Sequence, residues 1–358
     1  MSDLTIGLLS ALLATNQPQA ISNLVQQQTG VSVEVDNTRD PEENELRQLM
    51  MEDDAAIAEV NDWINTNSIA PTNAPALKDF NRRIRTRLDV VSKDYQNFLN
   101  AHPNSARGYL AYGSFLNDSG DEDGAVVQYE NSKQLDPKNP AVWNNLANYY
   151  GENGELTNAF ADYTEAIRLN PTEPVYYQNF ATTVYLYRKD AKEYYHIDEG
   201  QVFDKALGLY QQAMKLDPAN LVLATDYAMS YYGIRPLRTN DALVAWTNAY
   251  AIARDDNERS GVMIHLARVK MSAGFYDEAL GQLNAITNAA FADQRDRLKR
   301  SVAEHRAISL AATNLPAMTT NSPATTNPPP SATNTVPINT NPPSLIAPPP
   351  VPSVLKQP

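Results

Sequence analysis

The chain contains no cysteine among its 358 residues. Disulfides, zinc sites with thiolate ligands, iron–sulfur clusters and cysteine nucleophiles are therefore excluded. Basic residues are also few, since 29 Lys and Arg stand against 42 Asp and Glu, which gives a net charge of −13 at pH 7. Phosphate neutralisation needs clustered Lys and Arg, so this balance argues against a nucleic-acid partner.

Long apolar runs are missing as well. No stretch approaches the ~20 apolar residues that a membrane-spanning helix needs, so no membrane span is predicted. A short apolar stretch runs from Leu4 to Ala14, but the only charge before it is Asp3, whereas a secretory signal needs basic residues there. We therefore expect a cytoplasmic protein, with a periplasmic or envelope location as the alternative.

Residues that carry chemistry are sparse and scattered. The four His residues lie far apart, and the one grouping with metal-like spacing, Glu193, His196 and Glu199, is typical of a helix surface or loop. The sequence has no phosphate-cradling glycine loop and no G-x-S-x-G motif. We predict a protein that is not an enzyme and that has no catalytic residues, no cofactor and no metal.

The N-terminal third has two parts. Residues 1–39 are weakly patterned, and residues 40–105 are predicted to form a helical hairpin. Asp40 and Pro41 have the pattern of an N-cap and a first helical residue. Apolar residues at helical spacing then indicate one helix that ends near 65–68 and a second over about 76–100. The first helix is acidic and the second begins basic, so they either pack with complementary faces or offer a docking patch for an acidic partner.

The region after Ala106 repeats itself at an offset of 34 residues. At this offset Gly120 aligns with Gly154 and Pro137 with Pro171. About five units are predicted over residues 106–293, and they begin at Ala106, Pro140, Pro174, Leu221 and Ser260. The third unit carries 13 extra residues between its helices, because its second helix matches at an offset of 47 rather than 34.

Each unit reads as a helix, a turn and a second helix. In the second unit the positions that define the pattern are Trp143, Leu146, Ala147, Tyr150, Gly154, Ala159, Tyr163, Ala166 and Pro171. This pattern resembles the tetratricopeptide repeat, and the resemblance covers about residues 106–293. It implies an all-α fold, a right-handed superhelical solenoid of stacked helical hairpins, and a protein or peptide as the partner.

Two further segments follow the repeats. A charged helix over residues 290–312 is predicted to cap the last hairpin, because repeat arrays need a polar-faced cap. Residues 313–358 are rich in Pro, Thr and Asn, with Lys356 as the only charged side chain. Such a segment is predicted to be disordered. It is interpreted as a solubilising spacer, a ligand for a proline-binding domain or a glycosylated stalk.

The resemblance also implies where a ligand binds, because the first helices of successive repeats line a concave groove in this family. The predicted groove residues are Asn144, Asn145, Asn148, Gln178, Asn179, Thr182, Tyr185, Asp226, Tyr232 and Arg268, with Thr225, Met229 and His265 at further groove positions. Amide side chains can pair with both groups of a peptide backbone. The alternative is that these amides only satisfy the helix pattern of the family. Asp226 has the wrong sign for gripping a terminal carboxylate, so that binding mode is not expected.

The tyrosine-rich insertion over residues 184–203 is the second candidate contact site. Either the first helix of the third unit simply lengthens, with the tyrosines packed against a neighbour, or the tyrosines form a contact surface. Taken together, the sequence predicts a non-catalytic scaffold or adaptor that binds a peptide or protein segment in the groove. The alternative is a structural or assembly protein of the cell envelope, with the Pro-rich tail as a spacer.

Overall fold

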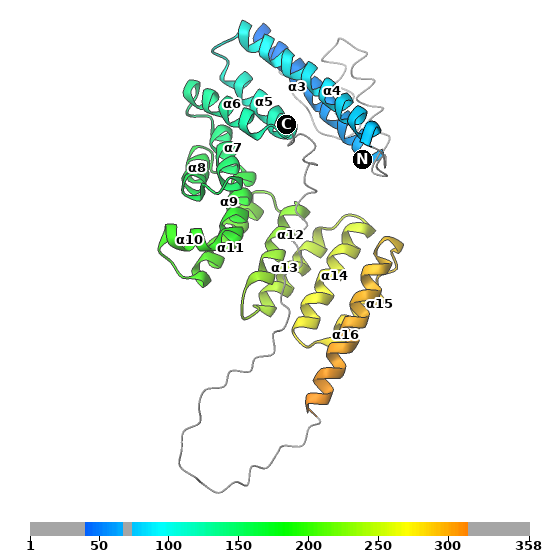
Figure 1. Ribbon diagram of the computed structural model, residues 1–358. Coiled ribbons are helices and arrows are strands. Elements are labelled where there is room, and N and C mark those ends of the chain that lie inside the picture. The colour runs from blue at the N-terminus through cyan, green and yellow to red at the C-terminus, as the bar shows by residue number, and fades with distance from the viewer. Residues whose placement is uncertain (1–39, 67–73, 314–358) are drawn as a thin grey trace, which may run out of the picture. The chain divides into compact units, whose positions relative to one another are not determined.

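Helices make up all the regular structure in the part of the chain that the structure describes. The computed structural model describes residues 40–66 and 74–313, and the predictions for residues 1–39 and 314–358 lie outside these ranges. The predicted all-α fold of helical hairpins is confirmed (Figure 1). The chain divides into two compact units between Leu135 and Asp136.

The first unit combines the predicted N-terminal hairpin with the first repeat. Its helices are α3 (Pro41–Thr66), α4 (Ala74–Ala101), α5 (Ala106–Asp118) and α6 (Glu122–Leu135). Asp40 caps α3, since its Oδ1 accepts a hydrogen bond from the Glu42 N–H at 3.0 Å. Arg87 of α4 pairs with Glu52 at 2.7 Å and with Glu59 at 2.9 Å. These ion pairs support the interpretation in which α3 and α4 pack with complementary faces.

The second unit contains four hairpins. Their first helices are α7 (Pro140–Glu152), α9 (Pro174–Leu186), α12 (Leu221–Ser230) and α14 (Asp256–Ser272). Their second helices are α8 (Leu156–Leu169), α11 (Glu199–Leu216), α13 (Thr239–Ile252) and α15 (Tyr276–Asn284). The helices of each hairpin approach closely because small residues lie between them, as at Ala147, Ala159 and Ala206, each 0% exposed. A run of such contacts gives one continuous core from α7 to α14.

Glycine sets the turn within three of the five repeats. Gly120, Gly154 and Gly274 have φ values of 88°, 82° and 81°, in the left-handed region that glycine adopts most cheaply. In each case the glycine N–H donates to the backbone carbonyl three residues before it, at 3.0, 3.4 and 3.0 Å. This bond satisfies one of the open carbonyls at the end of the first helix. The third and fourth repeats lack this glycine.

The insertion of the third repeat forms a separate helix, α10 (Arg188–Tyr195). The helical backbone breaks at Tyr187, where ψ is 49°, so the first helix does not simply lengthen, but the tyrosines do pack against a neighbouring helix, as the same alternative expected. The rings of Tyr194 and Tyr195 lie 5.3 and 5.7 Å from that of Phe160 on α8, between centroids. Lys205 Nζ lies 4.1 Å from the centre of the Tyr195 ring. These contacts hold α10 against α8 and α11.

Helix α16 (Ala292–Thr313) closes the core of the last hairpin. Leu298 and Val302 of α16 pack in a buried cluster with Ile264, Leu283 and Ile286. A short 3₁₀ turn, Ala289–Phe291, precedes α16, and a second one, Tyr231–Gly233, follows α12. The position and the buried side chains of α16 agree with its predicted role as a cap.

Candidate protein-binding face

Polar side chains join the first helices of the second unit. Asn179 on α9 donates from Nδ2 to Asn144 Oδ1 on α7 at 3.1 Å, and Asn144 donates from Nδ2 to Asn145 Oδ1 at 3.3 Å. Gln178 on α9 donates from Nε2 to Asp226 Oδ2 on α12 at 2.8 Å. We call these five residues the amide row. The row connects three successive first helices, α7, α9 and α12.

Hydrogen-bonding capacity remains in the amide row. Only Asn144 is buried, at 6% exposed, and the other four side chains are half-buried. Among the described residues, none donates a hydrogen bond to Asn179 Oδ1 or Gln178 Oε1. Burial raises the pKa of Asp226 above its ordinary value, and the hydrogen bond from Gln178 opposes this effect. The row therefore offers amide acceptors beside a carboxyl group that is already oriented.

Two predicted groove residues face the second helices instead. The Tyr163 hydroxyl on α8 donates to Asn148 Oδ1 at 2.7 Å, and Thr182 Oγ1 lies 2.8 Å from the Tyr210 hydroxyl on α11. Burial is the main cause that raises the pKa of both tyrosines, so their hydroxyls stay protonated at pH 7. Asn148 and Thr182 thus hold the two helices of a hairpin together.

Tyr185, predicted as a groove residue, lies in the hydrophobic core. It is 9% exposed, and its ring centroid lies 6.0 Å from that of Phe203 on α11. Its hydroxyl receives a backbone hydrogen bond from Gly233 of the next repeat. The ring is covered because the second helix of its own repeat and the turn of the following repeat both close over it.

A stacked pair of rings lies at the junction with the last hairpin. The rings of His265 on α14 and Trp246 on α13 lie 4.4 Å apart at an interplanar angle of 5°, and the Tyr232 hydroxyl lies 3.2 Å from His265 Nδ1. Burial, followed by the positive charge of Arg268, lowers the pKa of His265 to about 4, so the imidazole is neutral at pH 7. The sequence analysis missed Trp246 as a partner, although Trp246 occupies the second-helix position that Tyr163 has two repeats earlier.

The side chains of this face are joined to one another by hydrogen bonds. Within the described ranges, no three His, Asp or Glu side chains come together as metal ligands. None of the helices described here is long and apolar enough to cross a membrane. The side chains of the amide row can donate and accept at once, which suits recognition of a polypeptide backbone.

A family model of the tetratricopeptide repeat matches residues 140–173, the second repeat. The second repeat is therefore a tetratricopeptide repeat, and the stacked hairpins on either side of it have the helical-hairpin arrangement of that family. This family is generally non-catalytic, and its fold is that of a protein-interaction scaffold. Among curated protein sequences, none matches the chain.

Solved structures with a similar arrangement of helices include three repeat proteins. YrrB, described as a TPR protein with an unusual peptide-binding site, is 13% identical, with 62% of this chain and 98% of that chain covered and a TM-score of 0.41. TTC0263, a thermophilic TPR protein of Thermus thermophilus, is 20% identical, with 56% and 98% covered and a TM-score of 0.39. The pilF protein of Pseudomonas aeruginosa is 14% identical, with 74% and 99% covered and a TM-score of 0.44.

Proposed function

We propose that this protein is a non-catalytic scaffold that binds an extended peptide segment of a partner protein along the amide row. The observation that carries the proposal is that hydrogen bonds between side chains of the row link α7 to α9 and α9 to α12. An extended segment presents one N–H and one C=O group at each residue. The unused acceptors of Gln178 and Asn179 and the carboxyl group of Asp226 can take N–H groups, and the remaining amide hydrogens can donate to C=O groups.

The internal hydrogen bonds of the row favour binding. Asn179 is fixed by Asn144 and Gln178 by Asp226, so each side chain is already restricted before a ligand arrives. Binding then loses less side-chain entropy than it would with freely rotating amides. The same side chains keep part of their hydrogen-bonding capacity for the ligand, so the bonds that order them do not prevent them from binding a peptide.

A peptide-display selection tests this proposal. Peptides selected on the full chain are measured against two variants, Gln178→Ala/Asn179→Ala in the row and Gln212→Ala/Asn248→Ala on exposed positions of the second helices α11 and α13. Loss of about two hydrogen bonds, each worth about 1 kcal/mol, is expected to weaken binding at least tenfold in the row variant. The control variant is expected to bind as the wild type does.

The control variant removes two amides, as the row variant does, but from a different surface. Circular dichroism of both variants checks that the helices remain. Equal binding by the two folded variants contradicts the amide row as the binding site. A selection on the folded wild type that returns no peptide contradicts peptide binding itself.

A further inference from the structure

The third and fourth repeats share a departure from the repeat pattern. When the five repeats are aligned on their first helices, one position holds Gly120, Gly154, Arg188, Arg235 and Gly274 in order. Arginine thus replaces the turn glycine in two adjacent repeats. In both of them the connection to the second helix is longer than in the glycine repeats. It contains α10 in the third repeat and the segment from Ile234 to Arg238 in the fourth.

The arginine side chains take over the hydrogen bond of the missing glycine. Arg188 Nη1 donates to the Tyr185 carbonyl at 2.7 Å, and Arg235 Nη1 donates to the Tyr232 carbonyl at 2.8 Å. These carbonyls occupy the position that accepts from the glycine N–H in the other repeats. Arg235 Nη1 also donates to the Ile234 carbonyl at 2.9 Å. A guanidinium has five N–H donors, so capping fixes each group and leaves most of its donors available.

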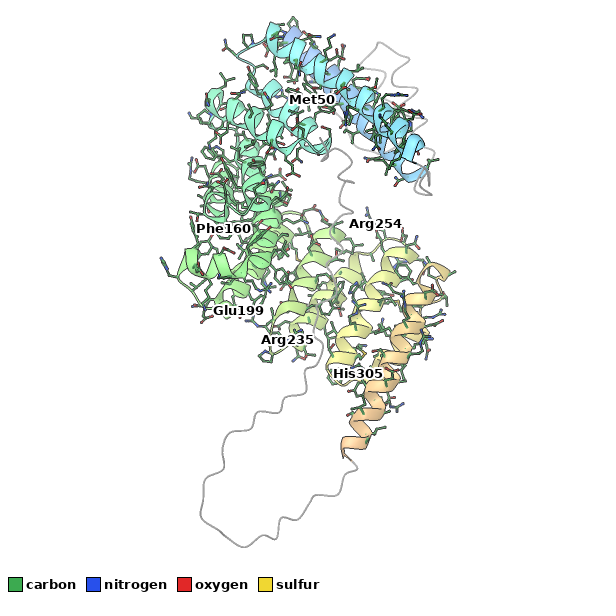
Figure 2. The ribbon with its side chains drawn as sticks, viewed as in Figure 1. Met50, Phe160, Glu199, Arg235, Arg254 and His305 are labelled. Carbon is green, nitrogen blue, oxygen red and sulfur yellow. The ribbon has the colours of Figure 1, made fainter. Side chains whose placement is uncertain are left out.

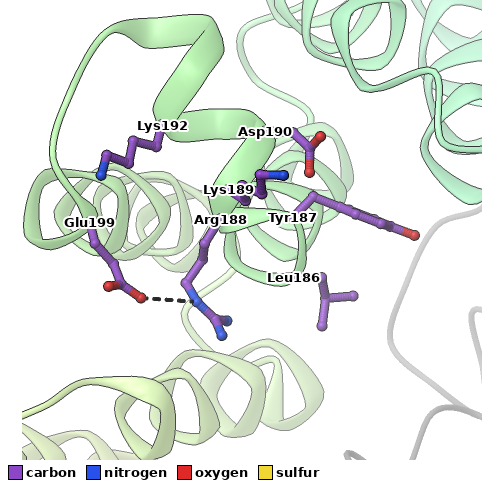
Figure 3. A pocket seen from close by; sticks show the side chains of 7 residues that line it. All are labelled: Leu186, Tyr187, Arg188, Lys189, Asp190, Lys192 and Glu199. Atoms are coloured by element: carbon purple, nitrogen blue, oxygen red, sulfur yellow. Dashed lines mark ion pairs between the residues drawn. The ribbon is translucent and has the colours of Figure 1, made fainter.

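The two arginines line adjoining pockets. The first has a volume of about 430 Å³ and lies between α10 and the start of α11, where Arg188 Nε faces Glu199 Oε1 at 3.7 Å (Figure 3). The second has a volume of about 360 Å³ and contains Arg235. Glu199 lines both pockets, and Figure 2 shows it near Arg235 on the same edge of the unit. The 3.7 Å between Arg188 Nε and Glu199 Oε1 is too long for a hydrogen bond, so Glu199 leaves the N–H donors of Arg188 available.

The charges of both guanidinium groups act on the hydroxyl of Tyr185. Burial raises the pKa of Tyr185, and the positive charges of Arg188 and Arg235 both oppose this effect. Arg188 also lies over two rings, 5.2 Å from the centre of Tyr185 and 5.4 Å from that of Phe203. The core of the third repeat therefore supports Arg188, and the two capping hydrogen bonds hold Arg235, so both charges have fixed positions.

Basic side chains outnumber acidic ones in the lining of the two pockets, five to two, although the whole chain has a net charge of −13. The residues with charged side chains that line the two pockets are Arg188, Lys189, Asp190, Lys192, Glu199, Arg235 and Arg238. Arg238 pairs with Asp204 at 2.5 Å. Lys189 and Lys192 are exposed and make no ion pair with any described residue. We call the five basic residues of this set the arginine edge.

We propose that the arginine edge binds an acidic peptide segment of a partner protein, whose carboxylates pair with Arg188 and Arg235. Fixed guanidinium groups suit bidentate pairing with carboxylates. The two unpaired lysines extend the attraction to further acidic side chains. Asp190 and Glu199 stand among the cations and limit how many carboxylates can pair there, so a short acidic segment fits better than a long polyanion. This site is separate from the amide row and does not depend on the proposed function.

Fluorescence polarisation of labelled hexaglutamate tests the proposal, with labelled hexaglutamine as the neutral probe. Hexaglutamate is expected to bind at least tenfold more tightly than hexaglutamine, and the difference is expected to shrink as salt is raised. Arg188→Gln/Arg235→Gln is expected to weaken hexaglutamate binding at least tenfold, and Lys189→Gln/Lys192→Gln about threefold. Arg297→Gln/Arg300→Gln on exposed positions of α16 removes the same charge and is expected to change nothing.

The lysine variant keeps the test informative if the arginine variant disturbs the turns, because Lys189 and Lys192 cap no helix. Equal hexaglutamate binding by the wild type and the folded lysine and arginine variants overturns the proposal, as does equal binding of the two probes. Tighter binding of a labelled thymidine hexanucleotide than of hexaglutamate overturns it in favour of a nucleic acid. Gln178→Ala/Asn179→Ala is expected to leave hexaglutamate binding unchanged, so the two proposed sites fail or succeed separately.

Discussion

Acidification changes the free energy of unfolding of the second unit through His265. Burial lowers the pKa of this imidazole from 6.5 to about 4. Between these pH values the unfolded chain binds a proton that the folded chain does not, so the folded state loses stability as the pH falls. The contribution is fully present above pH 6.5 and is lost progressively towards pH 4. Each pH unit within the window is worth about 1.4 kcal/mol, so a change from pH 7 to pH 5 costs about 2 kcal/mol.

The assay compares the full chain with a His265→Phe variant. Phenylalanine keeps a flat ring against Trp246, which lies 4.4 Å from the imidazole in the wild type, but it cannot titrate. Urea unfolding is followed at pH 7 and pH 5 by the fluorescence of Trp246, with Trp63→Phe and Trp143→Phe in both proteins. Loss of the contact with Tyr232 lowers the stability of the variant at both pH values, and it cancels when the two pH values are compared.

The expected result is a loss on acidification that is about 2 kcal/mol larger in the His265 protein than in the variant. All other titrating groups are common to both proteins, so they do not enter this difference. Equal losses in the two proteins refute the reasoning, because they mean that the imidazole of the folded state is as easily protonated as in the unfolded chain. A titration of the His265 ring by nuclear magnetic resonance measures the pKa directly.

Three further predictions concern the two units separately. Burial is the main cause that raises the pKa of Asp53 to about 6, so the first unit loses stability as the pH rises from 3.8 to 6. Asp53→Asn is therefore expected to raise the thermal midpoint reported by Trp63 more at pH 7.5 than at pH 4. An equal rise at both pH values would contradict a raised pKa of Asp53. Gly154→Ala is expected to lower the free energy of unfolding by about 1–2 kcal/mol, because the φ of Gly154 is 82°. Gly208→Ala inside α11, where an added Cβ meets open space, is expected to raise it by about 0.5–1 kcal/mol. Denaturant unfolding measures both changes, and changes of the same sign would refute the turn argument. Tyr195→Ala is expected to speed amide hydrogen exchange in α10 at least tenfold and to leave exchange in α7 unchanged, because the Tyr195 ring anchors α10 on α8. Unchanged exchange in α10 would show that other contacts hold this helix in place.

Local signals explain why the helices of the repeats could be predicted from the sequence. Helix α7 begins at Pro140, where proline suits the first helical position, and Asn139 accepts a hydrogen bond from the Ala141 N–H at 3.1 Å. Gly154 then ends the hairpin turn with a positive φ. Each of these residues acts within a few positions of itself, so its effect can be recognised without knowing the tertiary structure.

The candidate site was predictable only in part, because its geometry depends on contacts between repeats. The sequence placed Gln178, Asn179 and Asp226 on first helices, but not the hydrogen bonds that join them across repeats. Tyr185 fits the groove pattern by position and still lies in the core, because the residues that cover it come from a later helix and the next turn. The exchange of glycine for arginine at position 188 was visible in the repeat alignment, yet only the structure shows which carbonyl the side chain caps.

Arginine side chains, rather than a glycine N–H, cap the end of α9 and the Tyr231–Gly233 turn. The connections that follow them can therefore vary in length. A glycine N–H reaches its carbonyl only in one tight backbone geometry, so a residue added at Gly154 leaves the helix end exposed. A guanidinium on a long side chain reaches the carbonyl from a wider range of backbone paths, as it does at Arg188 and Arg235. Extra residues placed after these arginines are therefore compatible with an intact hairpin, and these turns are the natural positions for grafting a reporter or a binding loop.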